Sequence, residues 1–177
     1  MSVRISNNTM EVFNPETGED ITNISMTTLQ ELDSILQKVK TGAEKYNYSS
    51  FFHRQKLLSQ FRKGIVKRMD EFVDTICSET GKKPDEGLME VFISLEHIKQ
   101  SSHHLYEALG KRSRRSGILK TRKAWVEYEP LGVAGIISPW NYPLILTVSP
   151  LVEALLAGNT VVLKPSEHTP LTTKLLK

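Results

Sequence analysis

The sequence predicts an α/β protein in which an N-terminal helical region leads into the start of a doubly wound parallel sheet, with an antiparallel strand segment before that sheet. Apolar residues recur at helical spacing in the stretch that ends at Gly110. Between Ala124 and Glu129 apolar and polar residues alternate, which is typical of a half-buried strand near a sheet edge. Beyond Leu131, runs with strand, helix and strand character predict one parallel βαβ unit.

The composition is that of an ordinary globular domain. The 177 residues are 39% hydrophobic and 24% charged, which is enough for a sizeable core. A net charge of +3 is too small to indicate binding to nucleic acid or to a membrane surface. No apolar run has the length of a spanning helix or a secretory signal, and the single cysteine, Cys77, fits a reducing compartment. We therefore expect a cytoplasmic protein.

Three parts of different character follow one another along the chain. Residues 1–110 are the N-terminal helical part, residues 111–130 hold a basic loop and an antiparallel strand, and residues 131–177 form the βαβ unit. No internal repeat or low-complexity tract interrupts them.

The helical part follows a turn at residues 14–18 and holds four amphipathic stretches. Thr28 and Glu31 form a capping box for the first helix, Gly81 ends the third, and Pro84 begins the fourth. The apolar residues expected to face inward in the first two helices are Leu29, Leu32, Leu36, Val39, Ala43, Tyr46, Leu58, Phe61, Ile65 and Met69. Those of the fourth helix are Leu88, Phe92, Leu95, Ile98, Leu105 and Leu109.

The βαβ unit is predicted from three apolar runs. Residues 131–137 are nearly all apolar, and small or β-branched, the pattern of a strand buried on both faces. Residues 144–157 predict a short apolar helix that Gly158 and Asn159 stop, and residues 160–163 predict a second buried strand. Thr169 is expected to cap a further helix that starts at Pro170.

The loop after the first buried strand carries a candidate oxyanion donor. Pro139 and Pro143 bracket Asn141 and restrict the backbone, which fixes the direction of its side chain. A fixed amide at the end of a buried parallel strand can stabilise negative charge on a carbonyl oxygen, and such a donor contributes about 3 kcal/mol in the transition state. The alternative is that Asn141 only satisfies backbone groups of its own loop, and that Trp140 is a core residue.

The loop after the second strand carries a candidate nucleotide contact. Lys164 precedes a proline and ends the strand, and Glu167 follows in the turn to the next helix. A carboxylate can accept both hydroxyls of an adenosine ribose and an ammonium can donate to the same ring, so the pair suggests a dinucleotide. The alternative is an exposed Lys and Glu on a connecting loop. No GxGxxG or Walker A motif occurs in the sequence.

Three consecutive segments resemble the motifs that open the cofactor domain of the aldehyde dehydrogenase superfamily. They are Glu129-Pro130-Leu131-Gly132-Val133, Ser138-Pro139-Trp140-Asn141-Tyr142-Pro143, and GNTVVLKPSEHTP at residues 158–170. Their order and separation match, and Glu79-Thr80-Gly81-Lys82 with the preceding helices is similar too. The chain therefore resembles the N-terminal portion of that family over essentially its whole length.

The resemblance implies a role for each candidate residue. Asn141 is the catalytic residue, as the side-chain half of the oxyanion hole that holds the aldehyde oxygen while a cysteine thiohemiacetal forms. The implied cofactor-binding residues are Ile137, Ser138, Pro139, Trp140, Lys164, Ser166 and Glu167. The family passes hydride to NAD or NADP. Glu167 favours NAD because its charge opposes a 2′-phosphate, although Lys164 can offset that charge.

The resemblance also implies an aldehyde substrate and a homo-oligomer that assembles through the strand segment, with no nucleic acid, membrane or metal as a partner. It places the catalytic cysteine and the general-base glutamate beyond residue 177. Cys77 is expected to be a core residue, because it follows Phe72, Val73 and Ile76 at helical spacing and has no evident base nearby. Two parallel strands alone leave a sheet partly open. We therefore expect these residues to be an N-terminal piece of a longer enzyme, and we expect this piece to be inactive by itself.

Other patterns carry less weight. The basic run of residues 111–115 predicts a solvated loop rather than a contact with nucleic acid or lipid. His97 and His104 lie two helical turns apart, too far to share a metal ion. The alternative function is a non-catalytic helical interaction or assembly module that pairs with a partner through residues 124–128.

Overall fold

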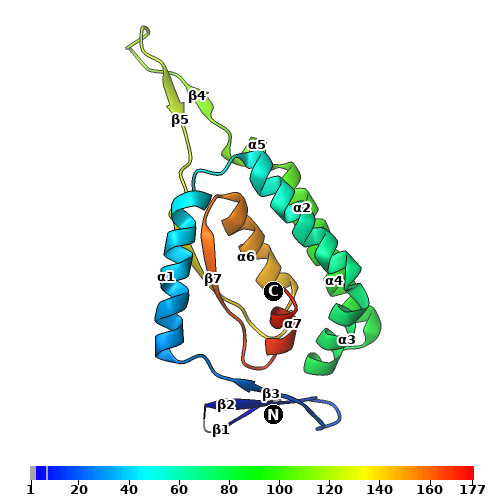
Figure 1. Ribbon diagram of the computed structural model, residues 1–177. Helices are drawn as coiled ribbons and strands as arrows, with labels where there is room; N and C mark the ends of the chain where they lie inside the picture. Colours follow the sequence, from blue (N-terminus) through cyan, green and yellow to red (C-terminus); the bar gives the residue numbers. More distant parts are fainter. Residues whose placement is uncertain (1–2, 7) are drawn as a thin grey trace.

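The computed structural model describes residues 3–6 and 8–177, in which helices surround a two-stranded parallel sheet and a small antiparallel sheet lies at one end (Figure 1). The antiparallel sheet has the order β1-β2-β3, with β1 (Val3–Ser6), β2 (Thr9–Phe13) and β3 (Asp20–Ser25). The predicted turn joins β2 to β3, and the Asn14 side chain accepts a hydrogen bond from the Glu16 amide there. The sequence predicts no strand in this stretch, because the strands are short and β3 is mostly polar.

The helical part contains α1 (Leu29–Tyr46), α2 (Phe51–Lys67), α3 (Met69–Thr80), α4 (Pro84–His103) and the short α5 (Leu105–Leu109). The predicted capping box is confirmed, since the Glu31 amide donates to the Thr28 hydroxyl and the Thr28 amide donates to the Glu31 carboxylate. The predicted end of α3 is confirmed as well: Gly81 adopts a left-handed conformation with φ of 70°. Pro84 is the first residue of α4, as predicted.

The predicted inward face of α4 is confirmed at Leu95 and Ile98, which are buried, and is wrong at Leu88 and Phe92. Leu88 and Phe92 are 47% and 57% exposed, whereas Gly87, Glu90 and Val91 are buried. Gly87 allows α3 to approach closely, because a Cβ at this position would lie 2.9 Å from a side chain of α3. Glu90 is turned inward because its carboxylate binds the start of another helix. Small and charged residues therefore occupy positions that hydrophobicity alone assigns to the surface.

A two-stranded antiparallel ribbon follows the helices. β4 (Arg112–Arg114) pairs with β5 (Ala124–Val126), and the ribbon projects away from the helices at the top of Figure 1. The predicted strand is confirmed over its first three residues. The basic run is exposed, but it is a strand rather than the predicted loop because it pairs with that segment.

The predicted parallel βαβ unit is formed by β6 (Val133–Ile137), α6 (Ile145–Leu156) and β7 (Thr160–Lys164), and α7 (Pro170–Lys174) follows it. α1 and α6 both pack against the two strands, and Figure 1 shows β7 between them. The cover is incomplete, since Leu131 is 96% exposed and Ile137 is 80% exposed. Residues 131–137 are therefore not buried on both faces, and the expected partly open sheet is what two parallel strands alone produce.

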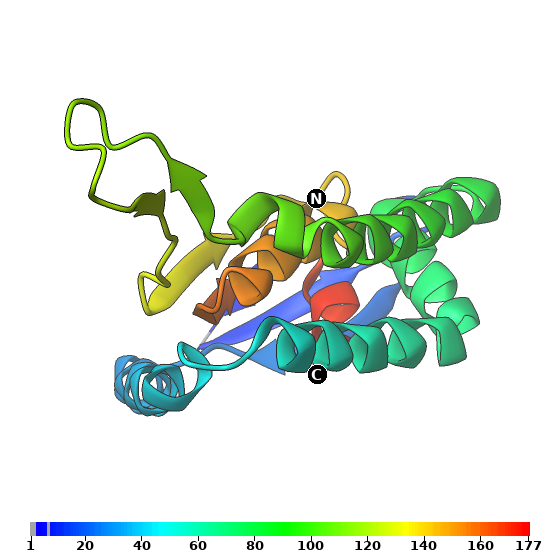
Figure 2. The same cartoon turned by 90° about the horizontal axis from the view of Figure 1, so that it is seen from above.

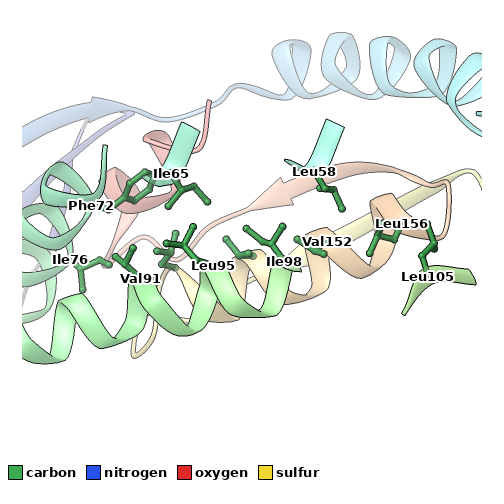
Figure 3. Packing of buried hydrophobic residues seen from close by; sticks show 12 residues of the cluster. Leu58, Ile65, Phe72, Ile76, Val91, Leu95, Ile98, Leu105, Val152 and Leu156 are labelled. Atoms are coloured by element: carbon green, nitrogen blue, oxygen red, sulfur yellow. The ribbon is translucent and has the colours of Figure 1, made fainter. Parts of the chain in front are cut away.

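The hydrophobic core lies between α2, α3, α4 and α6, and Figure 2 shows α2 and α4 running alongside each other. Its buried residues form one cluster (Figure 3): Leu58, Ile65, Phe72, Ile76, Val91, Leu95, Ile98, Leu105, Leu144, Val148, Val152 and Leu156. Because α6 contributes to this cluster and also contacts both parallel strands, it connects the N-terminal helices to the sheet.

The C-terminal end of α6 is held by side chains from α1 and α2. The Arg54 guanidinium donates to the Leu156 carbonyl oxygen at 3.0 Å, and the Tyr46 hydroxyl donates to the Leu155 carbonyl oxygen at 3.1 Å. Arg54 is only 5% exposed and also donates to the Asn47 carbonyl oxygen at 3.0 Å. A cation at this place satisfies carbonyl groups that the helix leaves unpaired and complements the helix dipole.

The position of Arg54 depends on the glycine after this helix, and we expect Gly158→Ala to lower the free energy of unfolding by about 3 kcal/mol or more. The φ of Gly158 is 91°, and an added Cβ would lie 2.5 Å from Arg54 Nη2, so the substitution strains the backbone and displaces the guanidinium. Gly18→Ala is the matched control, because its φ is 75° and no atom lies within 4 Å of the added Cβ. The control should lose about 1 kcal/mol. Urea denaturation measures both losses, and equal losses would contradict a role for Arg54.

Candidate functional site

The two loops that carry the candidate residues lie side by side at the carboxyl ends of β6 and β7. Ile137 pairs with Lys164 in parallel register, and the Ser138 amide donates to the Lys164 carbonyl oxygen at 3.1 Å. The first loop comprises residues 138–144 and the second comprises residues 165–169. Open parallel sheets bind their ligands at this edge. The register therefore brings the two sets of predicted residues to one edge of the molecule.

Asn141 occupies an exposed position in the first loop. Within residues 3–6 and 8–177, its side chain makes no hydrogen bond. It therefore does not serve the loop backbone, which was the alternative role for this residue. Pro139 is exposed and Pro143 is buried, so the chain turns inward two residues after Asn141. The carboxamide is thus accessible to a ligand at the sheet edge.

Aromatic rings connect the two loops. Trp140 is 56% exposed, and its ring centroid lies 6.5 Å from that of His168 in an edge-to-face arrangement. This exposure excludes Trp140 as a core residue. Ile137 is exposed next to Lys164 in the adjacent strand, so an apolar surface adjoins the polar groups of the second loop.

Lys164, the last residue of β7, forms an exposed ion pair with Glu167 of the second loop. The ammonium donates to the carboxylate at 2.8 Å, and the side chains are 61% and 48% exposed. This hydrogen bond, together with the charge of Lys164, lowers the pKa of Glu167. An exposed pair of this kind contributes little to the stability of the fold. It does place a hydrogen-bond donor and an acceptor side by side for a ligand. Because the ammonium offsets the carboxylate charge, Glu167 is a weak barrier to a 2′-phosphate.

Two of the predicted contacts, Ser138 and Ser166, are buried. Ser138 is 4% exposed, and its hydroxyl has no hydrogen-bond partner within the described part of the chain. Ser166 is 6% exposed, and its hydroxyl accepts a hydrogen bond from the His168 amide at 3.2 Å. The Ser166 side chain therefore stabilises the turn that carries Glu167.

A buried carboxylate of α4 caps the N-terminus of α6. Glu90 Oε1 accepts hydrogen bonds from the Leu144 amide at 2.8 Å and from the Ile145 amide at 3.3 Å. Its side chain is fully buried, and Oε2 accepts from the Lys82 ammonium at 2.6 Å. Leu144, the residue before the helix, provides no side-chain cap. Glu90 thus satisfies amides that the helix itself leaves unpaired.

A second buried glutamate caps α7 from α3. Glu79 is 2% exposed and accepts from the Leu171 amide at 2.6 Å, from the Thr172 amide at 2.8 Å and from the Thr172 hydroxyl at 2.7 Å. Thr169 makes no side-chain cap hydrogen bond, so the predicted cap of this helix is wrong. Burial raises the pKa of Glu79, although the three hydrogen bonds act in the opposite direction.

Neither of these helix N-termini is open to an anion. In an ordinary dinucleotide-binding unit the diphosphate binds the N-terminus of the helix after the first strand. Here Glu90 and Glu79 already accept the first amides of α6 and α7. The phosphates of a dinucleotide are therefore not bound by these two helices, which agrees with the lack of a GxGxxG motif.

The environment of Cys77 suits packing rather than nucleophilic attack. Its sulfur lies against α4, 2.9 Å from the position that a Cβ on Gly87 would take. Burial and the neighbouring charge of Asp74 raise the pKa of its thiol. A nucleophilic cysteine needs the opposite shift.

The two candidate histidines face separate carboxylates. His97 lies 3.2 Å from Glu153, and His104 lies 3.1 Å from Glu107. Over residues 3–6 and 8–177 there is no group of three His, Cys, Asp or Glu side chains that could hold a metal ion. Nor is any helix within these ranges long and apolar enough to cross a membrane.

Glu79, Lys82 and Glu90 are structural parts of the site that the sequence does not predict. The first two belong to a tetrapeptide noted above for its similarity to the family, which is the only local signal. Glu90 lies in the middle of an amphipathic helix, and its amide partners are 54 and 55 residues away in the sequence. Contacts of that sequence separation leave no trace in a local pattern.

Comparison with known proteins shows which family the chain resembles. Residues 3–177 match the profile of the aldehyde dehydrogenase family. The chain is 32% identical over 180 residues to 2-hydroxymuconic semialdehyde dehydrogenase of Pseudomonas sp. strain CF600, and the match covers 97% of this chain and 36% of that protein. It is 29% identical over 171 residues to D-glyceraldehyde dehydrogenase (NADP(+)) of Picrophilus torridus, which covers 97% of this chain and 34% of that protein.

A solved structure shares the fold. The NADP-dependent glyceraldehyde-3-phosphate dehydrogenase of Bacillus halodurans C-125, complexed with NADP, superimposes with a TM-score of 0.87 at 25% identity. The superposition covers 95% of this chain and 37% of that one. The chain spans about a third of the length of the relatives that it matches.

The buried cap of α7 makes stability depend on pH. Because the folded-state pKa of Glu79 lies above its ordinary value of 4.5, its stabilising contribution is complete below that value and is lost as the pH rises through the folded-state pKa. Wild type should therefore lose stability relative to Glu79→Gln as the pH rises from about 4 to about 8. Urea denaturation of both proteins across this range measures the difference. A growing advantage of wild type would mean that the donors from Leu171 and Thr172 outweigh burial.

Proposed function

Because the chain belongs to the aldehyde dehydrogenase family, we propose that the protein oxidises an aldehyde to a carboxylic acid with NAD or NADP, the cofactors that this family uses. The observation that supports this most is the edge of the parallel sheet, where an exposed carboxamide, an ammonium and a carboxylate lie on two adjacent loops. The names of two relatives, dehydrogenases of 2-hydroxymuconic semialdehyde and of D-glyceraldehyde, support an aldehyde as the substrate class.

Asn141 is the catalytic residue of this proposal. Its carboxamide donates a hydrogen bond to the aldehyde oxygen while a cysteine thiolate attacks the carbonyl carbon and a thiohemiacetal forms. The oxygen gains negative charge in this step, and a donor fixed in advance stabilises that charge without reorganisation. When bound, NAD(P) supplies the hydride acceptor. Cys77, the single cysteine of these 177 residues, is not the nucleophile of this proposal, so another part of the enzyme supplies the thiolate. The general-base glutamate is assigned to that part by the family resemblance.

The proposed cofactor-binding residues are Ile137, Ser138, Pro139, Trp140, Lys164, Ser166 and Glu167. The Glu167 carboxylate accepts from the hydroxyls of the adenosine ribose, and the Lys164 ammonium donates to the same ring. The exposed side chains of Ile137 and Trp140 provide an apolar surface beside them. Both serines are buried: the Ser166 hydroxyl accepts from the His168 amide and supports its loop, and Ser138 contributes to the cofactor site through its backbone.

The ribbon of β4 and β5 is the proposed element of homo-oligomerisation. It extends away from the helices in Figure 1, and Trp125 and Val126 are 51% and 37% exposed on it. A two-stranded ribbon is marginally stable alone, and its unpaired edges are suited to pair with a strand of a second copy. In this arrangement residues 1–110 and 131–177 belong to the NAD(P)-binding domain, and residues 111–130 form the assembly segment.

Asn141→Ala should lower kcat for aldehyde oxidation by about a hundredfold to a thousandfold, because one oxyanion donor is lost. The assay measures NAD(P)H formed from an aldehyde panel by the purified product of the complete gene. Asn23→Ala, which changes an exposed amide on β3, is the matched control and should keep the wild-type kcat. An unchanged kcat in Asn141→Ala would remove the residue from the mechanism.

The 177-residue chain by itself, with its intact mass confirmed, should show no turnover. Sustained turnover would refute the assignment of the nucleophile to another part of the enzyme. A gene product that ends at Lys177 and is inactive would favour the alternative function, an interaction or assembly module.

The preference for NAD or NADP should depend on the net charge of the Lys164 and Glu167 pair. Glu167→Gln should raise the affinity for NADP relative to NAD by about fivefold, because one charge about 4 Å from a 2′-phosphate in water contributes about 1 kcal/mol. Lys164→Met should change the ratio in the opposite direction. Titration of both cofactors at low salt gives the two Kd values. A ratio that neither substitution alters would place the 2′-position away from this pair.

A further inference from the structure

A buried ion pair outside the two loops contacts the segment that follows Asn141. The Lys82 ammonium lies 2.6 Å from Glu90 Oε2 and 3.9 Å from the centroid of the Tyr142 ring. The other carboxylate oxygen, Oε1, accepts from the amides of Leu144 and Ile145. Tyr142 is the residue directly after Asn141. The pair therefore contacts a ring and two amides within the four residues that follow the candidate oxyanion donor.

Because this pair is buried, the relative positions of its two charged groups are tightly constrained. The Glu90 side chain is fully buried and that of Lys82 is 15% exposed, so neither group can exchange its partner for bulk water at low cost. Removing one member of a buried pair leaves an uncompensated charge. A shift of the backbone at Leu144 and Ile145 would therefore leave the buried carboxylate or these amides without a partner.

We propose that Glu90 and Lys82 are positioning residues that fix the Asn141 carboxamide in the orientation needed to stabilise the oxyanion, an inference that rests on the function proposed above. Glu90 acts through the backbone amides at the start of α6, and Lys82 acts through the Tyr142 ring. Neither residue touches the substrate. An oxyanion donor must lie within about 3 Å of the reacting oxygen, so a small displacement of the loop is enough to weaken it.

The first test is independent of activity. In Glu90→Gln and Lys82→Met, the nuclear magnetic resonance signal of the Asn141 side-chain amide, assigned by its loss in Asn141→Ala, should shift and broaden. The Leu144 and Ile145 amides should exchange faster with solvent in Glu90→Gln. An Asn141 signal that stays in place in both variants would overturn the inference.

The controls separate positioning from a general loss of stability. Glu96→Gln and Lys99→Met change the same residue types on α4 at positions whose side chains are 34% and 60% exposed. Both should leave the Asn141 signal unchanged. If Glu90→Gln does not fold, Lys82→Met decides the question, because it keeps the carboxylate that caps α6. Lys82→Arg should restore the signal, since it returns a cation to the pair.

The second test uses the active gene product. Glu90→Gln should lower kcat by about tenfold to a hundredfold with little change in KM for NAD(P), because a misplacement of about 1 Å can cost a hundredfold. The double variant E90Q/N141A should be no slower than N141A, since a residue that acts through the amide has no effect once the amide is gone. Additive losses would overturn the inference. A wild-type gene product without activity would refute the proposed function, and the resonance test would still decide the role of Glu90 and Lys82.

Discussion

Charged side chains of the N-terminal helices hold both ends of the two helices that follow the site loops, and the rest of the site depends on these contacts. Glu90 accepts the first amides of α6, and Arg54 donates to the carbonyl oxygen of its last residue, Leu156. Glu79 does the same at the start of α7, and Arg68 donates to the Leu175 carbonyl oxygen at 2.8 Å near its end. The signs match the helix dipole in each case, with carboxylates at the N-termini and guanidinium groups at the C-termini.

These contacts explain how a sheet of only two parallel strands can present a defined edge. The strands leave Leu131 and Ile137 exposed, so their own burial does not fix the loops that follow them. The end of α3 and the turn after it supply the missing constraint, because Glu79 in the last turn of α3 caps α7 and Lys82 in the following turn pairs with the cap of α6. Gly81, in the left-handed conformation, ends α3 between these two residues. The helices that follow the two loops are thereby both held by residues at the end of α3 and the turn after it.

The parts of the fold that the sequence predicts are those with local causes. The capping box of Thr28 and Glu31, the stop at Gly81 and the ends of the parallel strands each depend on residues within a few positions. The short, polar strands β1 to β3 are missed for a local reason, whereas the failed prediction of the α7 cap has a distant one. The local sequence predicts Thr169 as the cap of α7, but the actual cap is Glu79, which binds the Leu171 amide from 92 residues earlier in the chain.

The rotation of α4 has the same distant origin. Hydrophobic periodicity predicts that Leu88 and Phe92 face inward, but both are exposed. The orientation of the helix about its axis instead places the Glu90 carboxylate against the start of α6. The cost of burying that charge is offset by two amides and an ammonium, which no pattern of apolar residues reports. An empty helix N-terminus that waits for a phosphate would leave these amides unpaired whenever the cofactor is absent. A protein carboxylate satisfies them at all times, so the backbone at Leu144 and Ile145 keeps this support with or without a bound dinucleotide.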